Sequence, residues 1–127
     1  MSNQPLVILL AEDDDHIRFL IQRTLEQHGY RVLPARDGAS ALQLARETTE
    51  TIHLLLTDVI MPNMDGLRLA EELRTTRPET PVLFISGYVE SHLVERSGQA
   101  AVLRKPFTGE ALLSAVRQQL NPPPPRD

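Results

Sequence analysis

Carboxylate side chains directly follow two short apolar runs of the sequence. Glu12 and Asp13 come after residues 6–11, and Asp58 comes after residues 52–57. If the ends of these runs lie together, the carboxylates repel and raise one another's pKa unless a cation compensates them. Magnesium takes oxygen ligands and is commonly held by one or two carboxylates together with phosphate oxygens. The acids therefore predict a Mg²⁺ site that is suited to phosphoryl chemistry.

A hydroxyl and an ammonium group follow two later apolar runs. Ser86, with Gly87 behind it, comes after residues 82–85, and Lys105 comes after residues 101–104. Phosphoryl transfer needs an in-line nucleophile, a metal that bridges the developing charge, and cationic or hydroxyl donors for the remaining oxygens. The four strand ends together supply all of these parts.

The elements that must position these residues are short apolar runs alternating with longer amphipathic stretches. Nearly unbroken apolar runs are typical of strands buried on both faces of a parallel sheet. Apolar residues spaced three and four apart, as from Ile17 to Leu25, indicate helices with one buried face, and Gly29 ends the first of them. The predicted strands are residues 6–11, 31–35, 52–57, 82–85 and 101–104, and the later predicted helices are 38–49, 66–76, 89–97 and 108–120.

The order of the elements predicts the fold class and the place of the site. Strand-helix alternation with short connections implies right-handed crossovers and an α/β doubly wound, three-layer fold. Pro34 cannot donate a hydrogen bond within a sheet, so the second strand belongs at an edge, as in the flavodoxin-like order 2-1-3-4-5. Ligands of such sheets bind at the carboxyl ends of the strands, here between strands 1 and 3.

Length and composition indicate one domain with a short tail. The 127 residues suffice for a single core, and we expect this domain to cover residues 1–121. Residues 122–127 begin with four prolines and favour an extended tail or linker remnant. The sequence has no cysteine, which excludes disulfides, thiolate metal sites and a cysteine nucleophile and suits a reducing compartment.

The charge pattern argues against nucleic acid and membranes as partners. The formal net charge is −4, and no stripe of Lys and Arg is present that could neutralise a phosphate backbone. The apolar run at 6–11 is too short to span a bilayer, and residues 1–5 lack the positive start of a signal peptide. We therefore expect a cytoplasmic protein.

Four segments, in this order and over nearly the whole chain, resemble the receiver domain of two-component response regulators. Each segment alone is a weak signal, but the combination is specific. Residues 84–88 are particularly similar to receivers attached to hybrid histidine kinases. The four segments are Glu12-Asp13-Asp14, residues 58–66, Ser86-Gly87 and Lys105-Pro106-Phe107.

The resemblance implies the make-up of the metal site. Glu12 and Asp13 would hold Mg²⁺ directly or through water, together with Asp58. The backbone carbonyl of Ile60 would be a further ligand. The peptide bond before Pro106 is implied to be cis.

The resemblance also implies the reaction and its partners. Asp58 would be the phosphoacceptor, and Ser86 and Lys105 would contact the phosphoryl oxygens. The donor would be a histidine kinase or a histidine phosphotransfer protein. The chain would then be a signalling domain that assists its own phosphorylation and dephosphorylation, and not an enzyme. Its signal would be read by an output domain or a partner protein outside this chain, which is either a stand-alone receiver or a piece of a larger protein.

Several of these residues also have a purely structural interpretation. For Asp14 or Asp15 we favour a helix N-cap, and for residues 61–66 a turn into the third helix. Lys105 alone would be an ordinary surface lysine. The hydroxyl of Ser86 has the alternative of bonding to its own backbone.

Three rival site types require residues that the sequence lacks. An EF-hand needs acids at alternating positions, where Ile17 and Arg18 stand. A phosphatase of the haloacid-dehalogenase type needs a second aspartate as general acid two positions after the nucleophile, and Ile60 stands there. A flavodoxin would need a hydroxyl-rich loop for the flavin phosphate, which residues 12–14 would repel.

The alternative function is a receiver-like interaction module with altered output switching. Val102 stands where the family usually has an aromatic residue, three positions before Lys105. The stretch from Ser86 to Lys105 is also about one helical turn shorter than in typical receivers. Both departures concern the readout of the signal and leave the phosphorylation residues in place.

Overall fold

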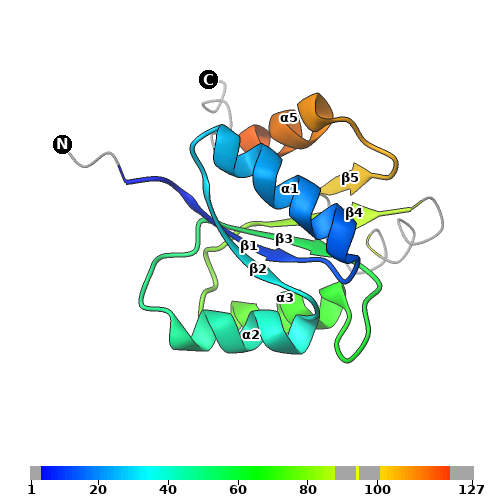
Figure 1. Cartoon of the computed structure of the whole chain (residues 1–127). Coiled ribbons are helices and arrows are strands. Elements are labelled where there is room, and N and C mark those ends of the chain that lie inside the picture. The colour runs from blue at the N-terminus through cyan, green and yellow to red at the C-terminus, as the bar shows by residue number, and fades with distance from the viewer. Residues whose placement is uncertain (1–3, 88–93, 95–100, 121–127) are drawn as a thin grey trace, which may run out of the picture.

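A parallel sheet of five strands forms the centre of the computed structural model, which describes residues 4–87, 94 and 101–120. Its strand order is β2-β1-β3-β4-β5, which confirms the predicted flavodoxin-like topology. The predicted helix at 89–97, apart from Val94, and the tail at 122–127 lie outside the described residues. The elements are β1 (Val7–Ala11), α1 (Asp15–Gln27), β2 (Arg31–Ala35), α2 (Gly38–Glu47), β3 (Leu54–Asp58), α3 (Gly66–Arg74), β4 (Val82–Ser86), β5 (Val102–Arg104) and α5 (Gly109–Leu120) (Figure 1).

The burial of the strands follows their place in the sheet. Every residue of β1 and β3 is buried, as their nearly unbroken apolar runs predicted. In the edge strand β2 only Val32 and Ala35 are buried, and the exposed Pro34 pairs with Leu10 of β1. Proline is therefore confined to an edge, where its missing donor costs the sheet least.

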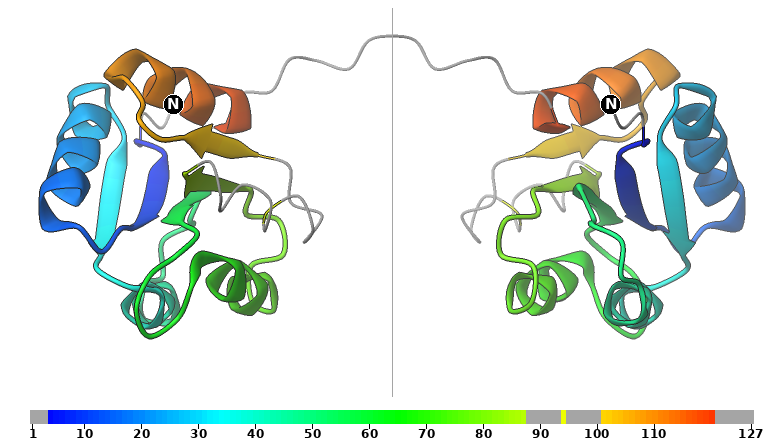
Figure 2. Two further views of the ribbon diagram at one scale, coloured as in Figure 1. Left: turned by 90° about the vertical axis from the view of Figure 1, so that its right-hand side faces the viewer. Right: turned by 90° about the vertical axis from the view of Figure 1, so that its left-hand side faces the viewer.

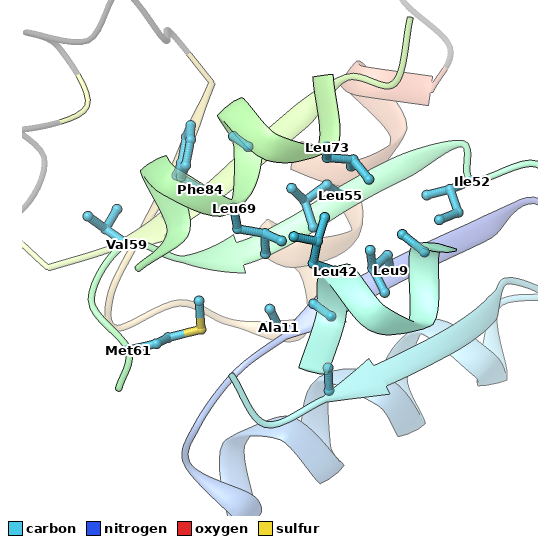
Figure 3. Close-up of a cluster of buried hydrophobic side chains, with 14 of the residues drawn as sticks. Leu9, Ala11, Leu42, Ile52, Leu55, Val59, Met61, Leu69, Leu73 and Phe84 are labelled. Carbon is cyan, nitrogen blue, oxygen red and sulfur yellow. The ribbon is translucent and has the colours of Figure 1, made fainter. Parts of the chain in front are cut away.

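Helices cover both faces of the sheet and divide the core into two clusters. In Figures 1 and 2, α1 and α5 lie on one face, and α2 and α3 lie on the other. On the second face Leu42 of α2 and Leu69 of α3 pack with Leu9 and Phe84 of the sheet (Figure 3). Among the described residues, no helix is long and apolar enough to cross a bilayer.

Two strand boundaries differ from the prediction in a way that concerns the site. Asp58 is the last residue of β3 and pairs with Ile85, and Ser86 is the last residue of β4 and pairs with Arg104. Both residues are therefore paired within the sheet. We expected them just beyond the strand ends because the apolar pattern stops one residue earlier.

Aspartates begin three helices. Asp14 accepts a hydrogen bond from the backbone N–H of Ile17 at 2.8 Å and caps α1, which confirms its predicted structural role. Asp37 caps α2, and Asp65 caps α3, in the same way. A cap of this kind stabilises a helix by about 1 kcal/mol, so these aspartates fix the residues at which α1, α2 and α3 begin.

Arg77 ties the end of α2 to the loop that follows α3. Its guanidinium donates hydrogen bonds to the backbone carbonyls of Glu50, Ala45 and Thr48, at 3.0, 3.1 and 3.3 Å. Carbonyls at the end of a helix have no partner within the helix, so this side chain satisfies groups that the sequence alone does not pair.

Arg77→Ala is expected to lower the free energy of unfolding by about 1–3 kcal/mol, because it removes a charged donor from partly buried carbonyls. Denaturant unfolding of the parent and the variant measures the change. Arg23→Ala, at an exposed position of α1, is the matched control and should change stability by less than about 0.5 kcal/mol. Equal stabilities of the two variants would contradict the role of Arg77.

Candidate functional site

The polar residues singled out in the sequence meet at the carboxyl edge of the sheet. Glu12 follows β1 directly, Asp58 ends the neighbouring β3, and Ser86 ends β4. Lys105 follows β5, and its backbone N–H donates to the carbonyl of Ser86 at 2.9 Å. The peptide bond from Lys105 to Pro106 is cis, as the family resemblance implied.

Three carboxylates form a group that could hold a metal ion. Glu12, Asp13 and Asp58 each offer an oxygen, and these atoms all lie within 4.8 Å of one another. Glu12 and Asp58 are 1% and 3% exposed, whereas Asp13 is exposed. The ammonium of Lys105 lies 3.1 Å from Oδ1 of Asp58.

Two buried oxygens of this group lack hydrogen-bond partners among the described residues. They are Oε1 of Glu12 and Oδ1 of Asp58; the second has Lys105 at ion-pair distance but without hydrogen-bond geometry. The other oxygen of Glu12 accepts the backbone N–H of Asp14 at 3.0 Å. Burying a carboxylate oxygen without a donor is costly. An oxygen-seeking divalent cation would supply the missing partner, so these residues fit Mg²⁺.

The surroundings of Asp58 favour its neutral form. Burial, followed by contact with the Glu12 carboxylate and that group's charge, raises the pKa of Asp58 to about 8, against the opposing effect of Lys105. For Lys105, burial is the largest single effect and favours the neutral amine, but the charge and contact of Asp58 together with the charges of Glu12 and Asp13 outweigh it and raise the pKa of the ammonium. The lysine therefore stays charged while the aspartate needs further positive charge to ionise near neutral pH.

The raised pKa of Asp58 predicts how the metal-free protein responds to pH. An unfolded aspartate ionises near pH 4, and the folded one holds its proton until about pH 8. Folding thus becomes less favourable as the pH rises between these values, because ionisation is easier in the unfolded chain. Each pKa unit corresponds to about 1.4 kcal/mol, and we expect a decline of at least this size.

Denaturant unfolding in a chelator from pH 5 to pH 8 measures this decline. Asp58→Asn, which has no charge to bury, should remove most of it. A parent whose stability is constant over this range, or a variant that declines as steeply, would contradict the assignment.

The structure does not give every predicted site residue its implied contact. The Ser86 hydroxyl donates to the backbone carbonyl of Gly87 at 2.9 Å, which is the alternative that its position at a strand end allowed. Ile60 follows β3 with a side chain that is 59% exposed. The roles of the Ser86 hydroxyl and the Ile60 carbonyl therefore remain predictions.

Arg18 is a residue of this site that the sequence interpretation used only to exclude an EF-hand. Its guanidinium donates to the backbone carbonyl of Glu12 at 2.9 Å and also to the carboxylate of Asp15. It thus holds the acidic loop against the first turn of α1. Its position one helical turn after the acids is the signal that could have indicated this contact.

The loop between β3 and α3 is packed more tightly than a simple turn requires. A Cβ on Gly66 would lie 2.0 Å from the carbonyl oxygen of Asp58, and a Cβ on Gly38 would lie 2.4 Å from that of Met64. Asn63 has a positive φ of 71° and donates from its amide to Asp37 at 2.9 Å. The turn formers Pro62, Asn63 and Gly66 predict a turn here, but no sequence pattern indicates the contacts of this segment with Asp37 and Gly38.

The fold and this arrangement of acids and lysine define a receiver domain, and comparison with known families agrees. The family model for the response regulator receiver domain matches residues 8–117, so the chain belongs to this family. The resemblance of residues 84–88 to hybrid-kinase receivers is confirmed by one relative and one solved structure.

The relatives differ in how much of their own length this chain matches. The response regulator receiver protein CpdR of Brucella abortus is 39% identical over 116 residues, which cover 89% of this chain and 95% of that protein. The sensor kinase CckA of the same organism is 35% identical, but the match covers 12% of its length. The response regulator MprA of Mycobacterium leprae is 35% identical, and the match covers 53% of its length. The chain thus spans a small part or about half of the longer relatives.

Solved receiver structures share the fold over nearly the whole chain. The receiver domain of the hybrid histidine kinase CckA has a TM-score of 0.76 and 39% sequence identity, covering 91% of this chain and 99% of that one. A response regulator receiver protein of Sinorhizobium medicae has a TM-score of 0.85 and 30% identity, covering 95% and 98%.

Proposed function

We propose that this receiver domain accepts a phosphoryl group on Asp58 from a phosphohistidine of a histidine kinase or a histidine phosphotransfer protein, with Mg²⁺ as cofactor. The observation that carries the proposal is a buried carboxylate next to two further acids and one lysine, with two carboxylate oxygens left without hydrogen-bond donors. Such a site is complete only when a cation and further oxygens are added. We also propose a cytoplasmic location, no binding of nucleic acid or membranes, and signalling rather than enzymatic activity.

The acids of the site would hold the cofactor and the nucleophile together. Glu12, Asp13 and Asp58 would be ligands through their side chains, and Ile60 through its backbone carbonyl. Bound Mg²⁺ supplies positive charge that stabilises both the Asp58 carboxylate and the phosphoryl oxygens. Because burial and Glu12 hold the pKa of Asp58 high, the nucleophilic carboxylate depends on this added charge.

The transfer step follows from the groups around Asp58. A carboxylate oxygen of Asp58 attacks phosphorus, the bond to the donor's imidazole nitrogen breaks, and this nitrogen keeps the electron pair and takes up a proton. Lys105, already 3.1 Å from the carboxylate, exchanges this contact for one with a phosphoryl oxygen. The Ser86 hydroxyl turns from the Gly87 carbonyl to donate to another phosphoryl oxygen.

Phosphorylation by a small donor tests the proposal. The chain is incubated with acetyl phosphate and Mg²⁺, and its intact mass is measured. We expect one phosphoryl adduct with Mg²⁺ and none with a chelator. The absence of an adduct under both conditions would reject the proposed function.

Metal binding is expected to depend on Asp13. Saturating Mg²⁺ at a hundred times its dissociation constant should stabilise the parent by about 2.7 kcal/mol, because the ion relieves repulsion among the acids. Asp13→Asn should stabilise the metal-free protein and remove most of the response. Thermal melts with Mg²⁺ and with a chelator measure both effects, and Asp14→Asn, which retains the N-cap, is the control. Equal shifts in the parent and Asp13→Asn would count against the site.

An interaction module with altered switching is the second candidate, favoured by Val102. This residue pairs with Phe84 across β4 and β5 and packs against the core cluster beneath α2 and α3. An aliphatic side chain here has no ring that could change place between two states. We propose that phosphorylation changes this domain mainly around Ser86 and not through Val102.

A further inference from the structure

The side chain of Asn63 joins the loop of the phosphoacceptor site to the start of α2. Its amide nitrogen donates to Oδ2 of Asp37 at 2.9 Å, across 26 positions of sequence. Oδ1 of the same carboxylate accepts the backbone N–H of Ser40 at 2.7 Å and caps α2. One buried carboxylate, 8% exposed, thus serves two elements at once.

Asn63 adopts a backbone conformation that glycine would satisfy, but it also carries an amide donor. Its φ of 71° lies in the left-handed region, where glycine is the least strained residue and asparagine is tolerated. A turn alone would be satisfied by glycine. Here the residue also carries a donor that meets Asp37, and both donors lower the pKa of that carboxyl, so the bond is made to a charged acceptor.

The hydrogen bond between Asn63 and Asp37 lies in the segment between β3 and α3, which also contains Ile60. At the far end, the N–H of Gly66 donates to the carbonyl of Val59 at 2.7 Å. Val59 and Met61 are buried in the core, whereas Ile60 between them is 59% exposed. The side chain of Ile60 thus contributes little to holding its own backbone, and the direction of its carbonyl depends on how the residues around it are held.

We propose that Asn63, through its hydrogen bond to Asp37, is a positioning residue for the metal site: it holds the β3–α3 loop so that the Ile60 carbonyl faces the ion. Gly38 supports this assignment, because its lack of a Cβ lets the Met64 carbonyl approach the first turn of α2. This inference rests on the proposed function, since it assumes that Mg²⁺ binds among Glu12, Asp13 and Asp58.

The test compares variants that break and rebuild this one hydrogen bond. Asn63→Gly removes the amide and keeps the backbone conformation, and Asn63→Asp places two carboxylates together. The double variant Asp37→Asn with Asn63→Asp reverses donor and acceptor, and asparagine in place of Asp37 would still cap α2. Mg²⁺ affinity is measured by calorimetric titration of the full chain, and the amide resonances of the loop are followed by NMR without and with the ion.

Asn63→Gly is expected to weaken Mg²⁺ binding about tenfold, the lower end for groups that orient metal ligands. Asn63→Asp should weaken it at least as much, and the double variant should return to within about threefold of the parent. Arg77→Ala, which destabilises the other end of α2, is the control and should keep the parent's Mg²⁺ affinity. A merely structural role of Asn63 would lower the stability of the variants and leave the Mg²⁺ affinity of the folded chain unchanged.

Two outcomes overturn the inference separately from the function. If the parent binds Mg²⁺ and Asn63→Gly binds it equally well, the hydrogen bond between Asn63 and Asp37 does not position the metal site, although the proposed function stands. If the double variant binds no better than Asn63→Asp, the hydrogen bond is not the cause. A parent that binds no Mg²⁺ overturns the proposed function and the inference with it.

Discussion

Asp58→Asn is expected to abolish the phosphoryl adduct completely. The amide oxygen of asparagine is a poor nucleophile and carries no charge for a cation to stabilise, so the group that attacks phosphorus is lost while the shape of the site is kept. The variant should fold, because it removes a carboxylate oxygen that is buried without a hydrogen-bond donor. Intact mass after incubation with acetyl phosphate and Mg²⁺ measures the result.

Asp65→Asn is the matched control for this loss of the adduct. It changes an exposed aspartate seven positions away, which caps α3, and asparagine is an equally good cap. We expect it to be phosphorylated as the parent is. If Asp58→Asn is labelled to the same extent as the parent, another residue is the phosphoacceptor.

Gly66→Ala is expected to have the second largest effect, on both stability and phosphorylation. An added Cβ would lie 2.0 Å from the carbonyl oxygen of Asp58 and 3.2 Å from Cγ2 of Thr57. The first neighbour is backbone and cannot rotate away, so α3 or the end of β3 must move. Overpacking of this kind typically costs about 1–3 kcal/mol, and a shift at the end of β3 would displace the nucleophile Asp58.

The measurements are denaturant unfolding and the rate of adduct formation at saturating Mg²⁺. Gly109→Ala is the control, because a Cβ there meets only Cγ2 of Thr24 at 3.8 Å, an ordinary contact. It should change stability by less than about 0.5 kcal/mol. If Gly66→Ala matches the parent in stability and rate, the close approach does not constrain the site.

The element order could be predicted because each strand and helix carries its own pattern. The fully buried strands β1 and β3 could be predicted from nearly unbroken apolar runs, and Pro34 identified β2 as an edge strand. The ends of β3 and β4 were predicted one residue too early. Polar residues at strand ends, such as Asp58 and Ser86, continue the hydrogen-bonded pairing without continuing the apolar pattern.

The candidate site could be placed from sequence because parallel strands end at one edge. Once the order 2-1-3-4-5 is inferred, Glu12 and Asp58 must follow neighbouring strands, and Lys105 must follow β5 at the same edge. The contacts of Asn63 and Arg77 could not be inferred in this way. Their partners lie 26 or more positions away, and no periodic pattern links a loop side chain to a distant backbone or carboxylate.

By itself, the sequence determined the fold class, the family and which residue types gather at the site, because hydrophobic periodicity and chain connectivity permit few arrangements. Only the tertiary structure decided which atoms lack partners, that Lys105 lies 3.1 Å from Asp58, and that the Ser86 hydroxyl bonds to its own backbone. These depend on side-chain rotamers and on the burial of each atom, which follow from packing among residues far apart in the chain.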